Sequence, residues 1–150
     1  MAKTSDRHTQ ILDGYRRGDT RFNAWAEEKL GTLRLTHWEW GRLTLAWEID
    51  DRFVMPDGVI FGGHVASVAD HVAGLVAMTV LEADDDRFRT SRLETIFFRP
   101  IMKPQARIEA RVVNASKSLI HVEADFLGPE GKLAARIAAV QMKRKEGNRD

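Results

Sequence analysis

Apolar positions recur at helical spacing through the middle of the chain. From Gly62 to Leu81 they return every three or four residues, at Val65, Val68, Ala69, Val72, Val76 and Val80. This spacing predicts a helix of about five turns that is apolar on nearly every side, which is typical of a buried helix. A second stripe on the same helix is small and polar and carries Gly63, Ser67, Asp70 and Gly74.

Asp70 is the only formally charged residue between Asp57 and Glu82. A lone carboxylate in a buried helix costs several kcal/mol unless it is paired, hydrogen-bonded or protonated, and such groups often do chemistry. We therefore expect Asp70 to lie in the core and to be a candidate catalytic group. The alternative is a structural aspartate that caps a neighbouring loop or reaches solvent through a gap.

Two short helices and two strands are predicted before this helix. The helices, Asp6 to Arg17 and Asp19 to Leu30, are separated by Gly18 and form an N-terminal flap (residues 1–30). Their inward residues are Ile11, Leu12, Tyr15, Phe22, Trp25 and Leu30. Alternation then predicts two strands that meet near Trp40-Gly41, with inward Leu33, Leu35, Leu43, Leu45 and Trp47.

Four further strand-like runs follow the helix: Phe88 to Pro100, Ala106 to Ala115, Leu119 to Leu127 and Lys132 to Lys143. One long helix after two strands and before four more indicates an α+β fold, in which an antiparallel sheet wraps a single helix. We expect one domain over residues 1–150, with a flexible tail at 144–150.

Composition excludes several classes of protein. The 150 residues carry 23 Lys plus Arg against 22 Asp plus Glu, so nothing indicates a nucleic-acid partner. Cysteine is absent, which removes disulfides and thiolate chemistry. Asp84-Asp85-Asp86 predicts a solvated corner and no metal site, because converging ligands are lacking. The N-terminus has no apolar core, and Asp70 argues against a membrane helix, so we expect a cytoplasmic protein.

Two motifs resemble a known family. Phe61-Gly62-Gly63, followed by Asp70 and then Ala73-Gly74, resembles the His-Gly-Gly-x6-Asp-x3-Gly helix entry of the phenylacetate-degradation (PaaI) type acyl-CoA thioesterases. The run Thr90 to Pro100 is similar to the next strand of that family, Thr-x-x-Leu-x-x-x-Phe-x-Arg-Pro. The resemblance covers about residues 31 to 143 and implies the hotdog fold, with five or six strands around the helix.

The resemblance also implies a function and an assembly. The expected reaction is hydrolysis of an acyl- or aryl-acyl-CoA, with coenzyme A as part of the substrate and no other cofactor. Asp70 falls on the position of the base or nucleophile, and Gly62 on that of the oxyanion-binding N–H, which the opposing subunit of a homodimer supplies. The implied substrate-binding positions are Met55, Phe61, Gly63, Thr90, Ser91 and Arg99. Pairing of dimers into a homotetramer is left open.

Two departures from the family leave a second function open. The family usually has His at the position of Phe61 and Asn at that of Met55, and neither present side chain can make their hydrogen bonds. The alternative is therefore a non-catalytic hotdog module that binds acyl-CoA as a sensor or scaffold. The dehydratase branch of the fold is disfavoured because its histidine motifs are absent.

The remaining candidates have ordinary structural explanations. His64 and His71 are expected on the surface or at a cap, since the family uses neither position. The four tryptophans, Trp25, Trp38, Trp40 and Trp47, are expected to pack under the flap, with an acyl pocket as the alternative for one of them. Arg99 and Lys103 could meet the phosphates of coenzyme A, or could be solvated charges at a strand end.

Overall fold

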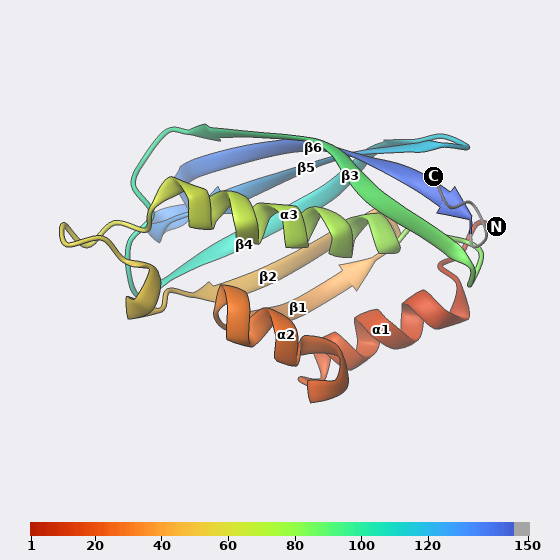
Figure 1. Cartoon of the computed structure of the whole chain (residues 1–150), viewed down its shortest axis with the longest axis horizontal. Coiled ribbons are helices and arrows are strands. Elements are labelled where there is room, and N and C mark those ends of the chain that lie inside the picture. Colours follow the sequence, from red (N-terminus) through yellow and green to blue (C-terminus); the bar gives the residue numbers. More distant parts are fainter. Residues whose placement is uncertain (146–150) are drawn as a thin grey trace.

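A single antiparallel sheet of six strands wraps around one helix, α3, in the computed structural model, which describes residues 1–145 (Figure 1). The strand order across the sheet is β1-β2-β4-β5-β6-β3, so β1 and β3 are its edges. The strands are β1 (Leu33–Glu39), β2 (Arg42–Glu48), β3 (Asp86–Phe97), β4 (Gln105–Ala115), β5 (Leu119–Leu127) and β6 (Leu133–Lys145). The helices are α1 (Asp6–Arg16), α2 (Thr20–Leu30) and α3 (Gly62–Met78), with short 3-10 turns at Asp51–Phe53 and Pro129–Gly131.

The core lies between α3 and the concave face of the sheet. The apolar stripe of α3 is buried there, with Val65, Val68, Ala69, Val72 and Val76. Alternate residues of the strands close the core from the other side, among them Leu43, Leu45, Trp47, Ile108, Ile120, Phe126 and Ile137. The predicted α+β fold with a helix wrapped by antiparallel strands is confirmed.

The central helix is shorter than its apolar pattern predicts. It ends at Met78, and Thr79, which caps it, donates from its hydroxyl to the Val76 carbonyl at 2.7 Å. The same hydroxyl accepts from the Gly41 N–H at 2.9 Å, so it binds the helix end to the turn between β1 and β2. Val80 and Leu81 continue the apolar pattern but lie buried beyond the helix.

The flap packs against β1 and α3, and its helices α1 and α2 lie below these two elements in Figure 1. Trp38 on β1 donates from its indole nitrogen to the Asp13 carboxylate on α1 at 2.9 Å. Trp47 is buried in the core, but Trp25 is 60 % and Trp40 41 % exposed. The expectation that all four tryptophans pack under the flap is therefore wrong for these two. Trp40 stands in the tight turn between β1 and β2. Trp25 on α2 keeps most of its surface exposed although its ring lies 5.9 Å from that of His71 on α3.

A bulge in β3 changes which of its residues face the helix. Thr90 pairs with Gln141 of β6, and the next pair along is Arg92 with Val140, so Ser91 is the extra residue. Because side chains alternate along a strand, one inserted residue reverses the faces. Phe88 and Phe97 both pack against the helix glycines, Phe88 at Gly74 and Phe97 at Gly62, although they stand nine positions apart.

The C-terminal end differs slightly from the expectation. β6 extends to Lys145, so residues 144 and 145 belong to a strand rather than to the predicted flexible tail. The rest of that tail, residues 146–150, lies outside the described residues.

Candidate active site

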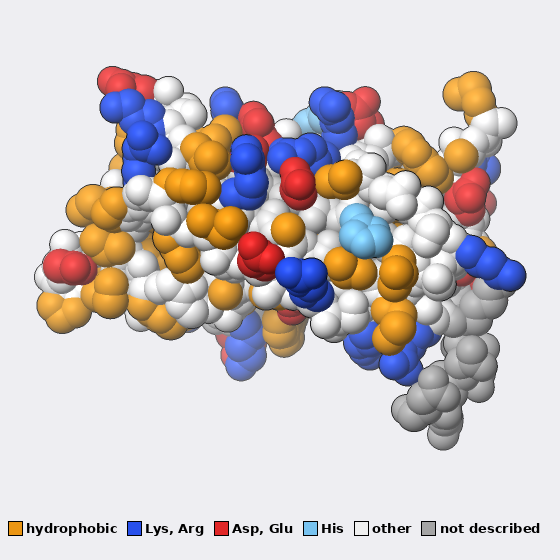
Figure 2. Space-filling view, turned by 90° about the horizontal axis from the view of Figure 1, so that it is seen from above, with side chains coloured by type: hydrophobic (Ala, Val, Ile, Leu, Met, Phe, Trp, Pro, Cys, Tyr) orange, Lys and Arg blue, Asp and Glu red, His pale blue; other side chains and the backbone are white. Residues whose placement is uncertain are grey.

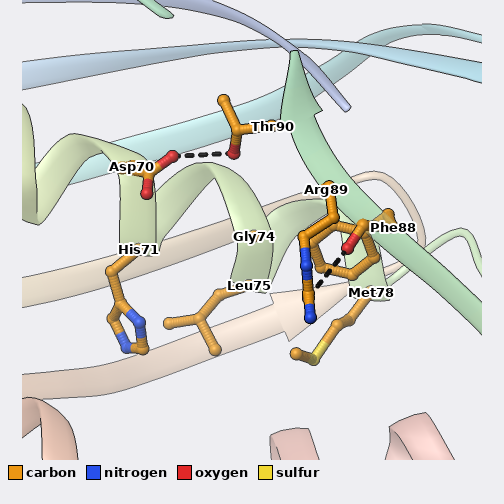
Figure 3. A pocket seen from close by; sticks show the side chains of 8 residues that line it. All are labelled: Asp70, His71, Gly74, Leu75, Met78, Phe88, Arg89 and Thr90. Atoms are coloured by element: carbon orange, nitrogen blue, oxygen red, sulfur yellow. Dashed lines mark hydrogen bonds between the residues drawn. The ribbon is translucent and has the colours of Figure 1, made fainter. Parts of the chain in front are cut away.

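An open cavity of about 440 Å³ lies between the second half of α3 and the start of β3 (Figure 3). Its walls come from both elements: Asp70, His71, Gly74, Leu75 and Met78 from α3, and Phe88, Arg89 and Thr90 from β3. Gly74 lies beside Phe88, and a Cβ there would be in ordinary contact with the Phe88 ring, at 3.4 Å. The small-residue stripe of α3 thus lines an accessible surface.

Asp70 faces this cavity and is exposed, so the expectation that it lies in the core is wrong for the chain by itself. The reason is its position on the small, polar stripe, which turns away from the sheet while the valine stripe turns towards it. Its Oδ1 atom accepts a 2.7 Å hydrogen bond from the hydroxyl of Thr90 (Figure 3). The carboxylate is therefore oriented by a neighbouring strand while remaining open to a ligand.

Of the two hydroxyl candidates on β3, Thr90 reaches the carboxylate and Ser91 does not. Ser91 is the bulged residue, and its hydroxyl donates to the Val140 carbonyl of β6 at 3.3 Å. Bulges are common beside active sites because they redirect a side chain. Thr90 also contacts the side chain of Gln141, with its Oγ1 atom 3.0 Å from the amide oxygen.

His71 forms the wall of the cavity towards the flap. It is partly buried, with its Nε2 atom 3.2 Å from the Tyr15 hydroxyl of α1 and its ring 5.9 Å from that of Trp25. Burial lowers the pKa of the His71 imidazole to about 4, against a smaller opposing effect of the Asp70 charge. The expected surface position is wrong, because the flap packs over this residue.

Gly62 lies at the other end of α3, in a second cavity. The residues around it include Met55, Val59, Ile60, Phe97 and Phe98. The N–H of Gly62 finds no acceptor within residues 1–145, as is usual for the first turn of a helix. Asp70 stands eight positions after Gly62, which is about 12 Å along the helix at ~1.5 Å per residue. One chain therefore does not bring the two predicted catalytic groups together.

The remaining predicted binding residues surround the start of α3. Phe61 caps the helix and is 43 % exposed, and Met55 in the preceding loop is 38 % exposed. Gly63 is exposed beside them, and a Cβ there would lie 3.3 Å from the Phe61 ring. Arg99 donates to the Leu133 carbonyl at 2.9 Å, which ties the chain just after β3 to β6. Lys103 pairs with Asp51.

His64 is buried, contrary to the expected surface or cap position. Only 4 % of its surface is exposed, its Nε2 atom lies 2.9 Å from the Leu30 carbonyl, and its ring stacks on Phe53 at 3.6 Å. Burial lowers the pKa of this imidazole. His64 therefore joins the end of α2 to the first turn of α3 as a structural residue.

The family of the chain follows from comparison with known proteins. A family model described as "Thioesterase superfamily" matches residues 57–135, which hold α3, β3, β4, β5 and the first residues of β6. The chain belongs to the thioesterase superfamily.

Relatives of this thioesterase-superfamily chain agree with that assignment. It is 32 % identical over 104 residues to a Saccharolobus solfataricus protein named "Putative esterase", covering 69 % of this chain and 73 % of that one. A phenylacetic acid degradation-related protein of Ralstonia eutropha is 26 % identical, with a TM-score of 0.75 over 91 % of this chain and 99 % of that one.

More distant structures show the same fold. A thioesterase of Haemophilus influenzae has a TM-score of 0.80 at 16 % identity, covering 99 % of this chain and 98 % of that one. A hypothetical thioesterase protein of Streptococcus pneumoniae, solved with coenzyme A, has a TM-score of 0.72 at 13 % identity, covering 85 % and 96 %.

Gln141 is a polar residue beside Thr90 in this candidate site that sequence reasoning missed. It is completely buried on β6, in line with Ala135, Ile137 and Ala139, which face the core. The signal available in the sequence was a single polar residue, Gln141, at a position where the alternation along the strand predicts an apolar, core-facing side chain.

Two classes of feature are lacking in the part of the chain that the structure describes. No group of three or more His, Asp or Glu side chains there could hold a metal ion. No helix among these residues is long and apolar enough to cross a membrane.

Proposed function

We propose that this protein hydrolyses acyl-CoA or aryl-acyl-CoA thioesters, with Asp70 as the general base or nucleophile. The observation that carries the proposal is the Asp70 carboxylate, held by Thr90 and open to a cavity on a helix whose other end presents an unpaired Gly62 N–H. Membership of the thioesterase superfamily supports the reaction class. The coenzyme A in the Streptococcus pneumoniae structure supports the carrier group.

The site is completed by a second copy of the chain. Asp70 and Gly62 are about 12 Å apart along one helix, too far to act on one thioester carbonyl. In a dimer with two-fold symmetry, a residue i that contacts residue j of the partner subunit implies that j contacts i of the partner. Ala66 is midway between Gly62 and Asp70. Two antiparallel copies of α3 that cross near Ala66 therefore bring Gly62 of the partner subunit towards Asp70. The exposed small-residue stripe of α3 allows this close approach.

The edge strand β3 supports the same assembly. It is the free edge on the Asp70 side of the sheet and carries exposed apolar side chains at Leu93, Ile96 and Phe97, with Phe98 just after it. Figure 2 shows hydrophobic side chains gathered at the end of the molecule where, in Figure 1, β3 ends near the loop before α3. A long apolar edge of this kind aggregates unless it is covered. Pairing of two β3 edges covers both.

The reaction follows from these groups. Asp70 either attacks the thioester carbon or takes a proton from a water molecule that does so, and Thr90 holds the carboxylate in position. The carbonyl oxygen gains negative charge, which the unpaired N–H of Gly62 and the positive end of the α3 dipole stabilise. When the carbon–sulfur bond breaks, the thiolate of coenzyme A leaves. If water was the nucleophile, the carboxylic acid forms directly and the proton held by Asp70 passes to the thiolate. If Asp70 was the nucleophile, the acyl group remains on it as a mixed anhydride, which a water molecule hydrolyses to restore the carboxylate, and the thiolate is protonated from water. The products are a carboxylic acid and free coenzyme A.

The test is a panel of CoA thioesters with short, long and aromatic acyl groups, read by release of free thiol. We expect turnover of at least one member by the wild-type chain. A chain that binds a thioether analogue in calorimetry but releases no thiol from any thioester is instead a binding module, the alternative that Phe61 and Met55 keep open.

A further inference from the structure

The hydroxyl of Thr90 makes two polar contacts but has only one proton, so it cannot be the donor in both. Its Oγ1 atom lies 2.7 Å from Asp70 Oδ1 and 3.0 Å from the side-chain amide of Gln141. An ionised carboxylate has no proton to donate, so the hydroxyl proton belongs to the contact with Asp70. The Gln141 side of the contact must then supply the other proton.

The side-chain amide of Gln141 can donate a hydrogen bond, and its nitrogen has no other acceptor within residues 1–145. Its side chain is completely buried, and with the amide oxygen turned to Thr90 the amide nitrogen has no partner among the described residues. A buried N–H group without an acceptor is unfavourable by about 1–3 kcal/mol. The two ends of an amide have nearly the same shape, so a half-turn about the last side-chain bond exchanges them within the same space.

We propose that Gln141 is a positioning residue that donates from its amide nitrogen to Thr90 and thereby directs the Thr90 hydroxyl at Asp70. The order of donation is Gln141 Nε2–H to Thr90 Oγ1, and Thr90 O–H to Asp70 Oδ1. This inference rests on the proposed role of Asp70.

The strand register makes this chain of hydrogen bonds rigid. Thr90 and Gln141 are directly paired residues of β3 and β6, next to the bulge at Ser91. The side chain of Gln141 is fixed by its burial among Ala139, Ile137 and the rest of the core. A hydroxyl that accepts from a fixed donor has fewer directions left for its own proton, so the orientation of Asp70 is set in advance of substrate binding.

A double-mutant cycle tests the proposal. Gln141→Met keeps an unbranched side chain of similar length and removes the donor, and we expect kcat to fall about tenfold with KM little changed. Thr90→Val removes the hydroxyl at constant shape, and Thr90→Ser restores it. If Gln141 acts through Thr90, adding Gln141→Met to Thr90→Val lowers kcat no further. An equal fall in both backgrounds overturns the proposal, because it shows that Gln141 only supports the fold.

A second measurement does not depend on activity. In a ¹H–¹⁵N correlation spectrum, the Gln141 side-chain amide is identified by its disappearance in Gln141→Met. We expect its resonances to shift in Thr90→Val and to stay near their wild-type positions in Thr90→Ser. Resonances that Thr90→Val does not move overturn the inference. If the wild-type chain hydrolyses no thioester yet these shifts occur, the proposed function has failed and the hydrogen-bond chain stands.

Discussion

The hydroxyl of Tyr15 lies 3.2 Å from Nε2 of His71, so the first helix of the flap is hydrogen-bonded to the residue beside Asp70. Trp25 of the second flap helix faces the same imidazole, with the ring centres 5.9 Å apart. The flap therefore encloses His71 against α3, and the ionisation of His71 depends on whether the flap stays in place.

The first prediction is a loss of stability at acid pH that His71 causes in part. Its pKa is about 4 in the folded chain and 6.5 in the unfolded chain, so the unfolded state binds more protons between these values. The contribution of the neutral His71 to stability is fully present above pH 6.5. It is lost as the pH drops towards 4, by about 3 kcal/mol at most. Urea unfolding at pH 7 and pH 5, at one protein concentration, measures the difference.

The control for this prediction is His71→Gln, which cannot be protonated. We expect its stability to change less between pH 7 and pH 5 than that of the wild type. Some pH dependence remains, because burial also lowers the pKa of His8 and His64. An identical fall in the variant and the wild type contradicts the role of His71.

The second prediction concerns Asp70. Asp70→Asn keeps the size and the contact with Thr90 but removes the basic carboxylate, so we expect kcat to fall at least about 10²-fold with the fold intact. Asp85→Asn is the matched control, since Asp85 is an exposed carboxylate in the corner before β3. Thiol release and circular dichroism on both variants measure activity and folding. Unchanged turnover in Asp70→Asn excludes the proposed mechanism.

The third prediction separates the N–H of Gly62 from its small size. Proline is favoured at the first position of a helix, and Phe61 before it is extended, with φ −69° and ψ 143°. Gly62→Pro therefore removes the N–H at little cost to the helix, and we expect kcat to fall by about 10²–10³-fold. Gly62→Ala also adds a Cβ near the Phe97 ring, at 3.1 Å, but keeps the N–H. Thiol-release assays should therefore find Gly62→Ala well above Gly62→Pro, and equal losses argue against an oxyanion role.

The fourth prediction is that the chain is an obligate dimer through β3. Ile96 is 45 % exposed on this edge, and a buried charge there opposes pairing, so Ile96→Lys should sediment as a monomer and lose activity. Val113→Lys is the control, because Val113 is 57 % exposed on β4, three strands away from β3 in the sheet. A soluble, folded wild-type monomer at micromolar concentration rules out the dimer.

The repeat of apolar residues predicted the fold because it reports directly on burial. The period of two in the strands and the valine stripe of α3 each mark one buried face, and the structure buries those faces. The same signal misplaced Asp70 and Trp25. A helix is apolar on most sides if the sheet covers one side and a second subunit covers another. The sequence of α3 alone therefore does not say which side packs on the sheet of its own chain.

The candidate site was named from the sequence on both α3 and β3, but without a choice between Thr90 and Ser91 and without Gln141. Asp70 and Gly62 were found through a motif, but the choice of Thr90 over Ser91 depends on a bulge that no local pattern marks. Gln141 comes from β6, more than fifty residues after Thr90, and only the strand register joins them. The burial of His64 and His71 likewise follows from long-range packing, since Leu30 and Tyr15 contact them from the flap.

The fifth prediction decides between an enzyme and a binding module and concerns Phe61 and Met55. Both are apolar where the PaaI-type thioesterases that the sequence resembles usually have His and Asn, and both are partly exposed at the start of α3. If the chain is catalytic, Asp70 and the Gly62 N–H carry the reaction, and Phe61→His adds a hydrogen-bonding ring beside the thioester. We then expect Phe61→His to raise kcat or leave it level.

A binding module gives the opposite result for the same variant. There the Phe61 ring supplies apolar contact, and replacing it by imidazole should weaken binding of a thioether analogue by about 1–3 kcal/mol through lost burial. Calorimetry with that analogue, run beside a thiol-release assay on the wild type and Phe61→His, separates the two cases. We expect turnover by the wild type, because an exposed carboxylate held by Thr90 serves hydrolysis and has no use in binding an acyl chain. Tight binding of the analogue without turnover, in both the wild type and Phe61→His, rules out the proposal that this protein is an enzyme.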